Sequence, residues 1–175
     1  KLVYWEIELE QSKDPGMYDI LSMQKSEANH LFSKFVENNY LGWLKDPEKA
    51  PLTSSYLIRR KAIPLADSSD DPVFFILIDN LRFDQWKVIQ PAVSELFKIV
   101  EEDTYCSILP TATQYARNAI FSGMMPSEIQ KRFPDKWVGD EEDEGKNNYE
   151  EFFLNDQLQR LRKNYTTSYS RVTNL

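Results

Sequence analysis

Apolar residues in the first third of the chain recur at helical spacing. The first cluster lies within residues 2–9, and Pro15-Gly16 is expected to end that segment. Two further clusters lie within residues 18–36, and Ser26 is the expected N-cap of the second of them. A short closing helix is expected over residues 40–44. The pattern predicts two or three packed helices with an apolar core that includes Leu21, Leu31, Phe32, Phe35, Trp43 and Leu44.

From residue 73 the pattern changes to alternating strands and helices. The continuous apolar run 73–78 is typical of a buried strand, and a second strand is expected over residues 105–109. Residues 84–102 lie between them and have helical spacing. We expect two helical pieces there, with Pro91 opening the second, because proline fits the first turn of a helix but not its interior.

The last third of the chain continues in the same style. A helix is expected over residues 113–122, with Gly123 as its C-cap and Pro126 as its stop. Residues 149–162 have the pattern of an amphipathic helix, and the alternation over residues 165–172 predicts a third strand. The fold class expected from these elements is therefore α/β, preceded by a helical bundle segment.

A polar stretch that ends in proline, residues 66–72, separates the helical pattern from the alternating strand and helix pattern. We place the domain boundary there, with a helical segment over residues 1–66 and an α/β domain over residues 67–175. The chain does not begin with methionine, which indicates an excised fragment.

Composition narrows the function classes. The net charge of -7 and the pI near 4.9 argue against a general binder of nucleic acids or anionic membranes, which would show a basic surface. No apolar stretch reaches the length of a membrane span. Because the single cysteine, Cys106, cannot form an internal disulfide, we expect a reducing compartment, the cytoplasm.

Two polar residues, Asp79 and Thr113, each come just after a predicted strand. Ligands of open α/β sheets bind outside the carboxyl ends of the strands, so both side chains are expected at one crevice. Asp79 offers a carboxylate ligand for a metal, and Thr113 offers a hydroxyl nucleophile at the start of a helix, where phosphate binds well. The alternative interpretation is that Asp79 caps a turn and Thr113 is an ordinary N-cap.

Three other side chains are candidates for binding substrate. Arg82 lies near the same expected crevice, although Asp84 is close enough in sequence to pair with it. Arg117 and Asn118 lie on the helix that begins at Thr113 and are placed to contact a phosphoryl oxygen. The alternative for these two is a solvent-facing pair.

The two motif stretches resemble the opening of a PglZ domain, a branch of the alkaline phosphatase superfamily. Residues 73–82 read Val-Phe-Phe-Ile-Leu-Ile-Asp-Asn-Leu-Arg, and residues 108–126 read Ile-Leu-Pro-Thr-Ala-Thr-Gln-Tyr-Ala-Arg-Asn-Ala-Ile-Phe-Ser-Gly-Met-Met-Pro. The Pro-Thr-x-Thr and Gly-x-x-Pro parts are also similar to the nucleotide pyrophosphatase/phosphodiesterase branch. In that branch the second threonine is the nucleophile, which corresponds to Thr113 and not to Thr111. Asp79 matches the aspartate that binds zinc.

The helical segment ahead of the PglZ-like part resembles the PorX type of response regulator, which regulates type IX secretion. The resemblance implies a parent protein that is a zinc-dependent phosphodiesterase or phosphatase in two-component signalling, with two zinc ions and a phosphodiester or nucleotide substrate. It also implies a homodimer through the helical segment, a sigma factor or another signalling protein as partner, and no membrane.

The ligand set is the main departure from the superfamily. Its two-zinc site needs further aspartates and several histidines, whereas this chain has one histidine, His30, which lies in the helical segment. Zinc binding by this chain alone is therefore expected to be absent or weak, and whether the chain is an enzyme stays open. The competing hypothesis is a non-catalytic interaction module with a vestigial PglZ site. The sequence does not identify the substrate, the oligomeric state or the input signal.

Overall fold

The computed structural model describes residues 1–12, 15–138, 145 and 147–172. The chain divides into two compact units. The first unit comprises Lys1–Ala50 and Leu77–Asp103, and the second comprises Pro51–Ile76 and Thr104–Leu175. Each unit is therefore built from two separate stretches of the chain.

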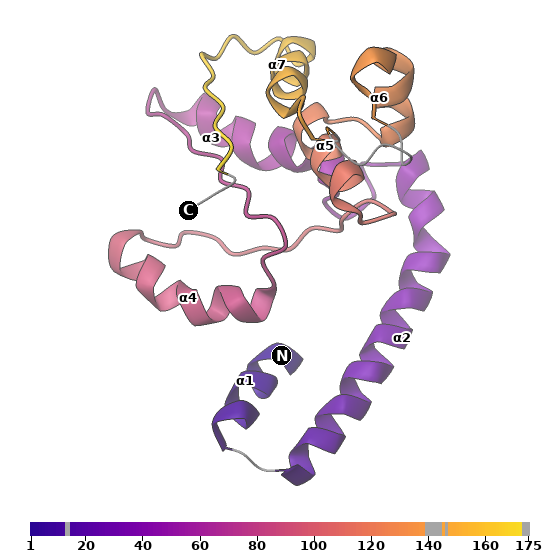
Figure 1. Cartoon of the computed structure of the whole chain (residues 1–175), viewed down its shortest axis with the longest axis vertical. Coiled ribbons are helices and arrows are strands. Elements are labelled where there is room, and N and C mark those ends of the chain that lie inside the picture. The colour runs from indigo at the N-terminus through magenta and orange to yellow at the C-terminus, as the bar shows by residue number, and fades with distance from the viewer. Residues whose placement is uncertain (13–14, 139–144, 146, 173–175) are drawn as a thin grey trace. The chain divides into compact units, whose positions relative to one another are not determined.

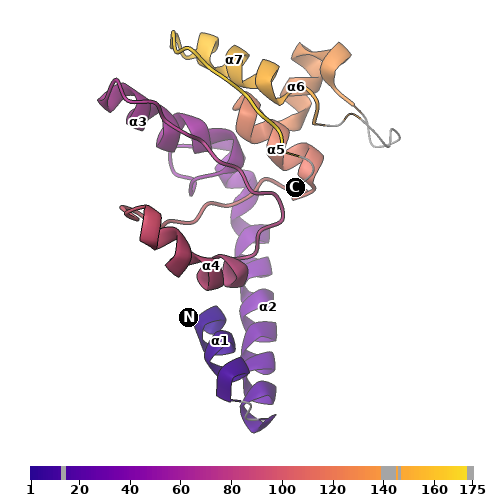
Figure 2. The same ribbon diagram turned by 60° about the vertical axis from the view of Figure 1, so that its left-hand side comes forward.

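The first unit is formed by three helices, α1 (Leu2–Ser12), α2 (Pro15–Lys45) and α4 (Phe83–Leu96). Helix α1 packs against both α2 and α4 (Figures 1 and 2). Leu9 of α1 and Leu21 of α2 are buried, and Lys25 donates a hydrogen bond of 2.6 Å to Glu6. Apolar burial and this cross-helix ion pair hold α1 on the first half of α2.

Helix α2 differs from the predicted set of short helices. It runs unbroken through 31 residues, and Ser26 lies in its interior. Serine favours an N-cap but does not prevent a helix from continuing, and Pro15 lies at the start of α2, where proline is tolerated. The predicted core was also wrong in part, because only Leu21 is buried and four of the six residues are exposed: Leu31, Phe32, Phe35 and Leu44.

Helix α4 corrects a second prediction. It is continuous from residue 83 to residue 96 with Pro91 inside it, instead of two pieces with Pro91 between them. A proline removes one backbone hydrogen bond, but the turns on either side stay bonded and α4 also packs on α1. The helix ends at Leu96, so the prediction that residues 97–102 are helical was wrong.

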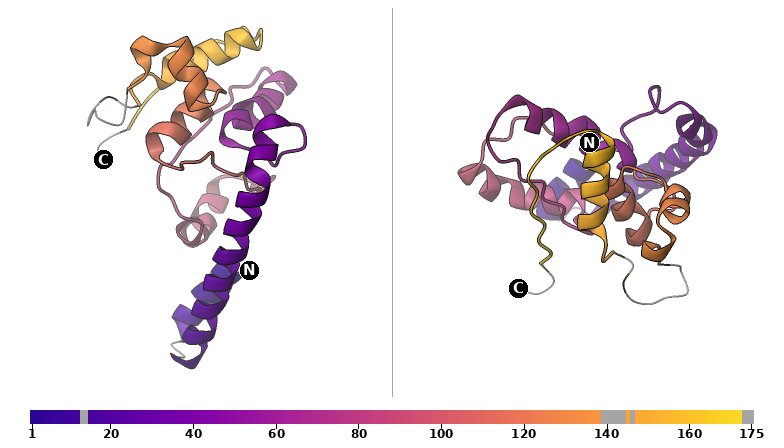
Figure 3. Two further views of the ribbon diagram at one scale, coloured as in Figure 1. Left: turned by 90° about the vertical axis from the view of Figure 1, so that its right-hand side faces the viewer. Right: turned by 90° about the horizontal axis from the view of Figure 1, so that it is seen from above.

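The second unit is organised around α5 (Thr113–Ser122), which contacts α7, η1 and α6 (Figure 3). The buried apolar side chains include Ile108, Ala119, Ile120, Ile129 and Phe153. Its other elements are short: η1 (Ser54–Tyr56), η2 (Ile58–Ala62), α3 (Ile63–Ser68), α6 (Pro126–Arg132), η3 (Pro134–Lys136) and α7 (Glu150–Arg160). Pro126 opens α6, which the sequence pattern did not predict.

The expected α/β class is wrong for this structure, because no sheet occurs among the residues it describes. The predicted strand 73–78 has no ladder partner, and its side chains Phe74 and Ile76 are 83% and 78% exposed. The predicted strand 105–109 contributes a single bridge, between Cys106 and Thr53. A strand exists only with a neighbour to accept and donate backbone hydrogen bonds, and no described segment takes that position along run 73–78.

The third predicted strand, 165–172, is also unpaired, but its alternation is real. Through residue 170 the odd positions, Tyr165, Thr167 and Tyr169, are half-buried and bond to other parts of the second unit, whereas the even positions are exposed. We call residues 163–171 the C-terminal strap, the extended yellow segment after α7 in Figure 1. The strap is attached to the rest of the second unit by side-chain contacts and not by a backbone ladder.

No helix in the described part of the chain is long and apolar enough to cross a membrane. The boundary predicted at residues 66 and 67 stays a prediction. Helix α3 passes through these residues, and the first and second units alternate along the chain.

Candidate functional site

Thr113 is the first residue of α5, as the sequence predicts for a nucleophile at a helix N-terminus. Its side chain is exposed. Ala112, the N-cap, supplies no side-chain acceptor, and its carbonyl accepts the N–H groups of Tyr115 and Ala116 at 3.0 Å each. The N-terminus of α5 therefore has no side-chain cap, and its partial positive charge favours an anion next to the Thr113 hydroxyl.

The other end of α5 explains why the helix stops where it does. Gly123 has a φ of 63°, a left-handed conformation that favours glycine, and its N–H bonds to the carbonyl of Ala119 at 2.9 Å. A Cβ at Gly123 would lie 2.0 Å from the amide nitrogen of Gln157. This glycine therefore both ends α5 and allows α7 to pack closely, which fixes the direction in which Thr113 is presented.

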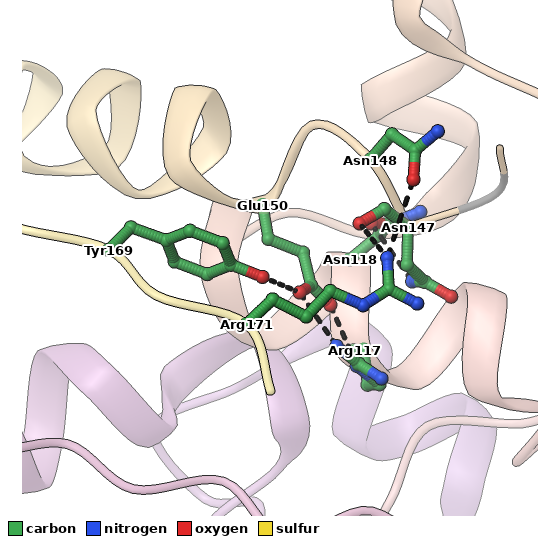
Figure 4. A network of polar contacts seen from close by, with 7 residues as sticks. All are labelled: Arg117, Asn118, Asn147, Asn148, Glu150, Tyr169 and Arg171. Carbon is green, nitrogen blue, oxygen red and sulfur yellow. Dashed lines mark hydrogen bonds and ion pairs between the residues drawn. The ribbon is translucent and has the colours of Figure 1, made fainter. Parts of the chain in front are cut away.

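Arg117 lies one turn after Thr113 and is paired with a buried carboxylate. Its Nε and Nη2 atoms each donate a 2.7 Å hydrogen bond to Glu150, the first residue of α7 (Figure 4). The side chain of Glu150 is 0% exposed and that of Arg117 is 15% exposed. A two-pronged pair of this kind fixes the guanidinium in one orientation.

Tyr169 of the C-terminal strap joins the same carboxylate by donating its hydroxyl proton to Glu150. Burial and this hydrogen bond to Glu150 raise the pKa of Tyr169 to about 12. The ring of Tyr169 also meets Phe121 of α5 edge-on, with 6.0 Å between centroids. Tyr169 is therefore a neutral donor at physiological pH and ties the strap to α5.

Asn118 is buried, with 4% of its surface exposed, which excludes the solvent-facing alternative for this residue. Its side-chain oxygen accepts a 3.3 Å hydrogen bond from the amide of Asn147. Arg171 donates to the side-chain oxygen of Asn148 at 3.3 Å, so the strap also reaches the turn before α7 (Figure 4). Arg117 and Asn118 thus both belong to a polar network around the buried Glu150, which comprises Arg117, Asn118, Asn147, Asn148, Glu150, Tyr169 and Arg171.

Asp79 and Arg82 belong to the first unit, whereas Thr113 belongs to the second. Asp79 is exposed and precedes Asn80, which has a φ of 58°. Arg82 forms the ion pair that the alternative interpretation expected, with Nη2 2.7 Å from Asp84. Without a sheet, the argument that Asp79 and Thr113 share one crevice has no structural support, and their roles stay predictions that rest on the motifs.

Sequence reasoning missed Glu150, Tyr169 and Asn147. Glu150 falls at the start of a correctly predicted amphipathic helix, where an acidic residue is usually solvated and stabilises the helix dipole. The alternation over residues 165–172 predicted a strand and did not identify Tyr169 as a partner of Glu150. The Arg117–Glu150 pair leaves no local sequence signal, because the two residues lie 33 positions apart.

The zinc centre that the resemblance implies can be compared with the donors present. Catalytic zinc takes three protein ligands from histidine, cysteine and carboxylate side chains. Among the described residues, no three such side chains gather into a group that could hold a metal ion. The described donors therefore do not fit a zinc centre by themselves.

Comparison with known families agrees with the motifs. Residues 1–44 match the PorX response regulator linker domain. A search of curated proteins found no significant match. Residues 57–175 match the BREX system PglZ alkaline phosphatase-like domain. The matches make this a signalling- and phosphoesterase-related protein, and since the second covers most of the sequence, the chain belongs to the PglZ alkaline phosphatase-like domain family.

Proposed function

We propose that this chain is part of a phosphoesterase in which Thr113 is the nucleophile. The observation that carries the proposal is the position of Thr113, exposed as the first residue of α5 within a PglZ-family match. The first backbone N–H groups of a helix and its dipole attract a phosphoryl group, and they also stabilise charge that develops on it. The Thr113 hydroxyl is then adjacent to the phosphorus that it attacks.

The finer parts of the proposal concern cofactor and substrate. We propose zinc as the cofactor, with Asp79 as one ligand and Thr113 as a second. We propose a phosphodiester or nucleotide as substrate, with Arg82, Arg117 and Asn118 as candidate contacts. The similarity of the Pro-Thr-x-Thr stretch to phosphodiesterases supports this substrate class.

The match at the N-terminus supports a proposal about the biological setting. A PorX-type linker supports a response regulator of type IX secretion in the cytoplasm. Such a protein acts on a signalling partner, for which a sigma factor is one candidate. Regulation of the reporter genes of that pathway by the full-length protein tests this setting.

Substitution of Thr113 in the full-length protein tests the chemistry. Thr113→Ala should lower hydrolysis of a chromogenic phosphodiester to background with the fold intact, because the exposed hydroxyl is lost with little packing. Asp79→Ala should also lower the zinc content of the purified protein. Thr111→Ala is the matched control, because it lies before the helix and should stay active. Full activity of Thr113→Ala would rule out covalent catalysis by this residue.

A non-catalytic interaction module is the second candidate, and the surface of α2 favours it. Apolar side chains lie exposed along this helix, among them Leu31, Phe32 and Phe35. Such a patch on a helix is typical of a protein interface, and we propose a second copy of the chain as its partner. A full-length protein that dimerises and signals equally well with Thr113→Ala would support this candidate over the enzyme.

A further inference from the structure

We propose that Glu150 and Tyr169 are positioning residues for Arg117, and that they hold its guanidinium ready for a phosphoryl group at Thr113. This inference rests on the proposed function. The geometry that carries it is the chain of contacts from Tyr169 through Glu150 to Arg117 (Figure 4).

The first step concerns the place of Arg117. It follows Thr113 by four positions on α5, so the two residues share a face of the helix about one turn apart. An arginine at that distance is long enough to reach an anion bound at the helix N-terminus. A free arginine would sample many rotamers, whereas two bonds to Glu150 select one of them.

The second step concerns Glu150. Its side chain is fully buried, and two residues from different segments occupy its oxygens: Arg117 from α5 and Tyr169 from the C-terminal strap. A buried carboxylate is costly unless its partners satisfy it, so the three groups stabilise one another in a fixed arrangement. The structure thus commits a buried charge to the orientation of Arg117.

The third step concerns the electrostatic consequence. Because Glu150 neutralises Arg117, the pair attracts a distant phosphate only weakly. An oriented guanidinium matters most when negative charge develops on the phosphoryl oxygens during reaction. Loss of the orientation should therefore lower kcat more than it raises KM.

Two pairs of matched variants in the full-length protein test the proposal by phosphodiester hydrolysis. Tyr169→Phe removes one hydroxyl and should lower kcat about tenfold with KM nearly unchanged. Its control, Tyr165→Phe, removes a second hydroxyl of the strap, which donates a hydrogen bond to Asp67. This variant should leave kcat unchanged. Glu150→Gln should lower kcat further, whereas Glu151→Gln, at an exposed neighbour, should not.

A double variant separates positioning from stability. With Arg117→Lys in place, the two-pronged pair is gone, so Tyr169→Phe should lower kcat no further. Fully multiplicative losses would contradict the proposal, as would equal kcat for Tyr169→Phe and Tyr165→Phe. The Thr113→Ala variant is measured in parallel. If it is inactive while Tyr169→Phe equals the wild type, the positioning role alone fails, and if it is active, the proposed function fails.

A measurement that does not depend on activity tests the proposal even if the Glu150→Gln variant does not fold. In ¹⁵N spectra of the 175-residue chain, the Arg117 Nε–H should exchange slowly with water, and Tyr169→Phe should speed that exchange where Tyr165→Phe does not. Rapid exchange of Arg117 in the unaltered chain would overturn the proposal.

Discussion

Arg82 and Arg117 are both held by carboxylates, but in different surroundings. The Arg82–Asp84 pair is at the surface and joins neighbours in sequence, so it contributes little to folding stability. The Arg117–Glu150 pair is buried and joins α5 to α7, so the loss of one partner leaves an unpaired buried charge, which costs about 3–5 kcal/mol. Arg117 therefore has a structural task in addition to any contact with substrate.

Titration of Asp84 tests whether Arg82 is committed to its pair. The hydrogen bonds from Arg82 lower the pKa of Asp84 from 3.8 to about 2. A pKa that is lower in the folded state means that the pair stabilises the fold above pH 4 and that this contribution is lost as the pH falls toward 2. In Arg82→Ala, the pKa of Asp84 measured by carboxyl ¹³C NMR should return toward 3.8, while Lys49→Ala should not change it. An unchanged pKa in Arg82→Ala would show that the pair is absent in solution.

At the scale of elements, helices with their own start and stop signals were predictable. Helix α5 was predicted with its bounds, because Gly123 ends it by backbone conformation and not through distant contacts. The bounds of α2 were missed, because Ser26 and the apolar spacing cannot show whether neighbouring helices fuse. The predicted strands failed because ladder partners are distant in sequence, and the polar network around Glu150 was missed for the same reason.

The exposed face of α2 leads to a prediction about association. Phe32 and Phe35 stack at 6.3 Å between centroids and are exposed. If they form a dimer contact, the double variant Phe32→Ser and Phe35→Ser should raise the dimer dissociation constant about tenfold or more, because aromatic anchors dominate interfaces. Analytical ultracentrifugation of the 175-residue chain measures it. Glu37→Ala, on the opposite side of the helix, is the control. A chain that is monomeric before substitution would contradict the prediction.

At the scale of the whole molecule, a response-regulator linker match and a PglZ match occur in one acidic chain. Composition argued against a general binder of nucleic acids or anionic membranes, and the two motif stretches indicated the family, but neither shows how a metal site is completed. That part depends on donors from distant positions, and no qualifying group lies within the described residues. The proposal that this signalling-related protein has phosphoesterase activity therefore depends on Thr113 more than on the proposed zinc ligands.

Zinc affinity should reflect this incomplete donor set. Isothermal titration calorimetry of the 175-residue chain at neutral pH should show weak or no zinc binding, because one carboxylate and one neutral hydroxyl leave most of the coordination sphere to water. Asp79→Ala should then change the isotherm little. A tight stoichiometric site that is lost in Asp79→Ala would show that this chain completes a zinc centre.

The most direct measurement is the site of covalent labelling during turnover. The full-length protein is mixed with a phosphodiester, quenched in acid, digested and analysed by mass spectrometry. If Thr113 is the nucleophile, it displaces one alcohol of the phosphodiester, and the phosphate with its remaining ester group should be attached to residue 113. Thr113→Ala should abolish this label. A label on Thr111, or turnover in which neither threonine is labelled and Thr113→Ala remains active, would contradict the account.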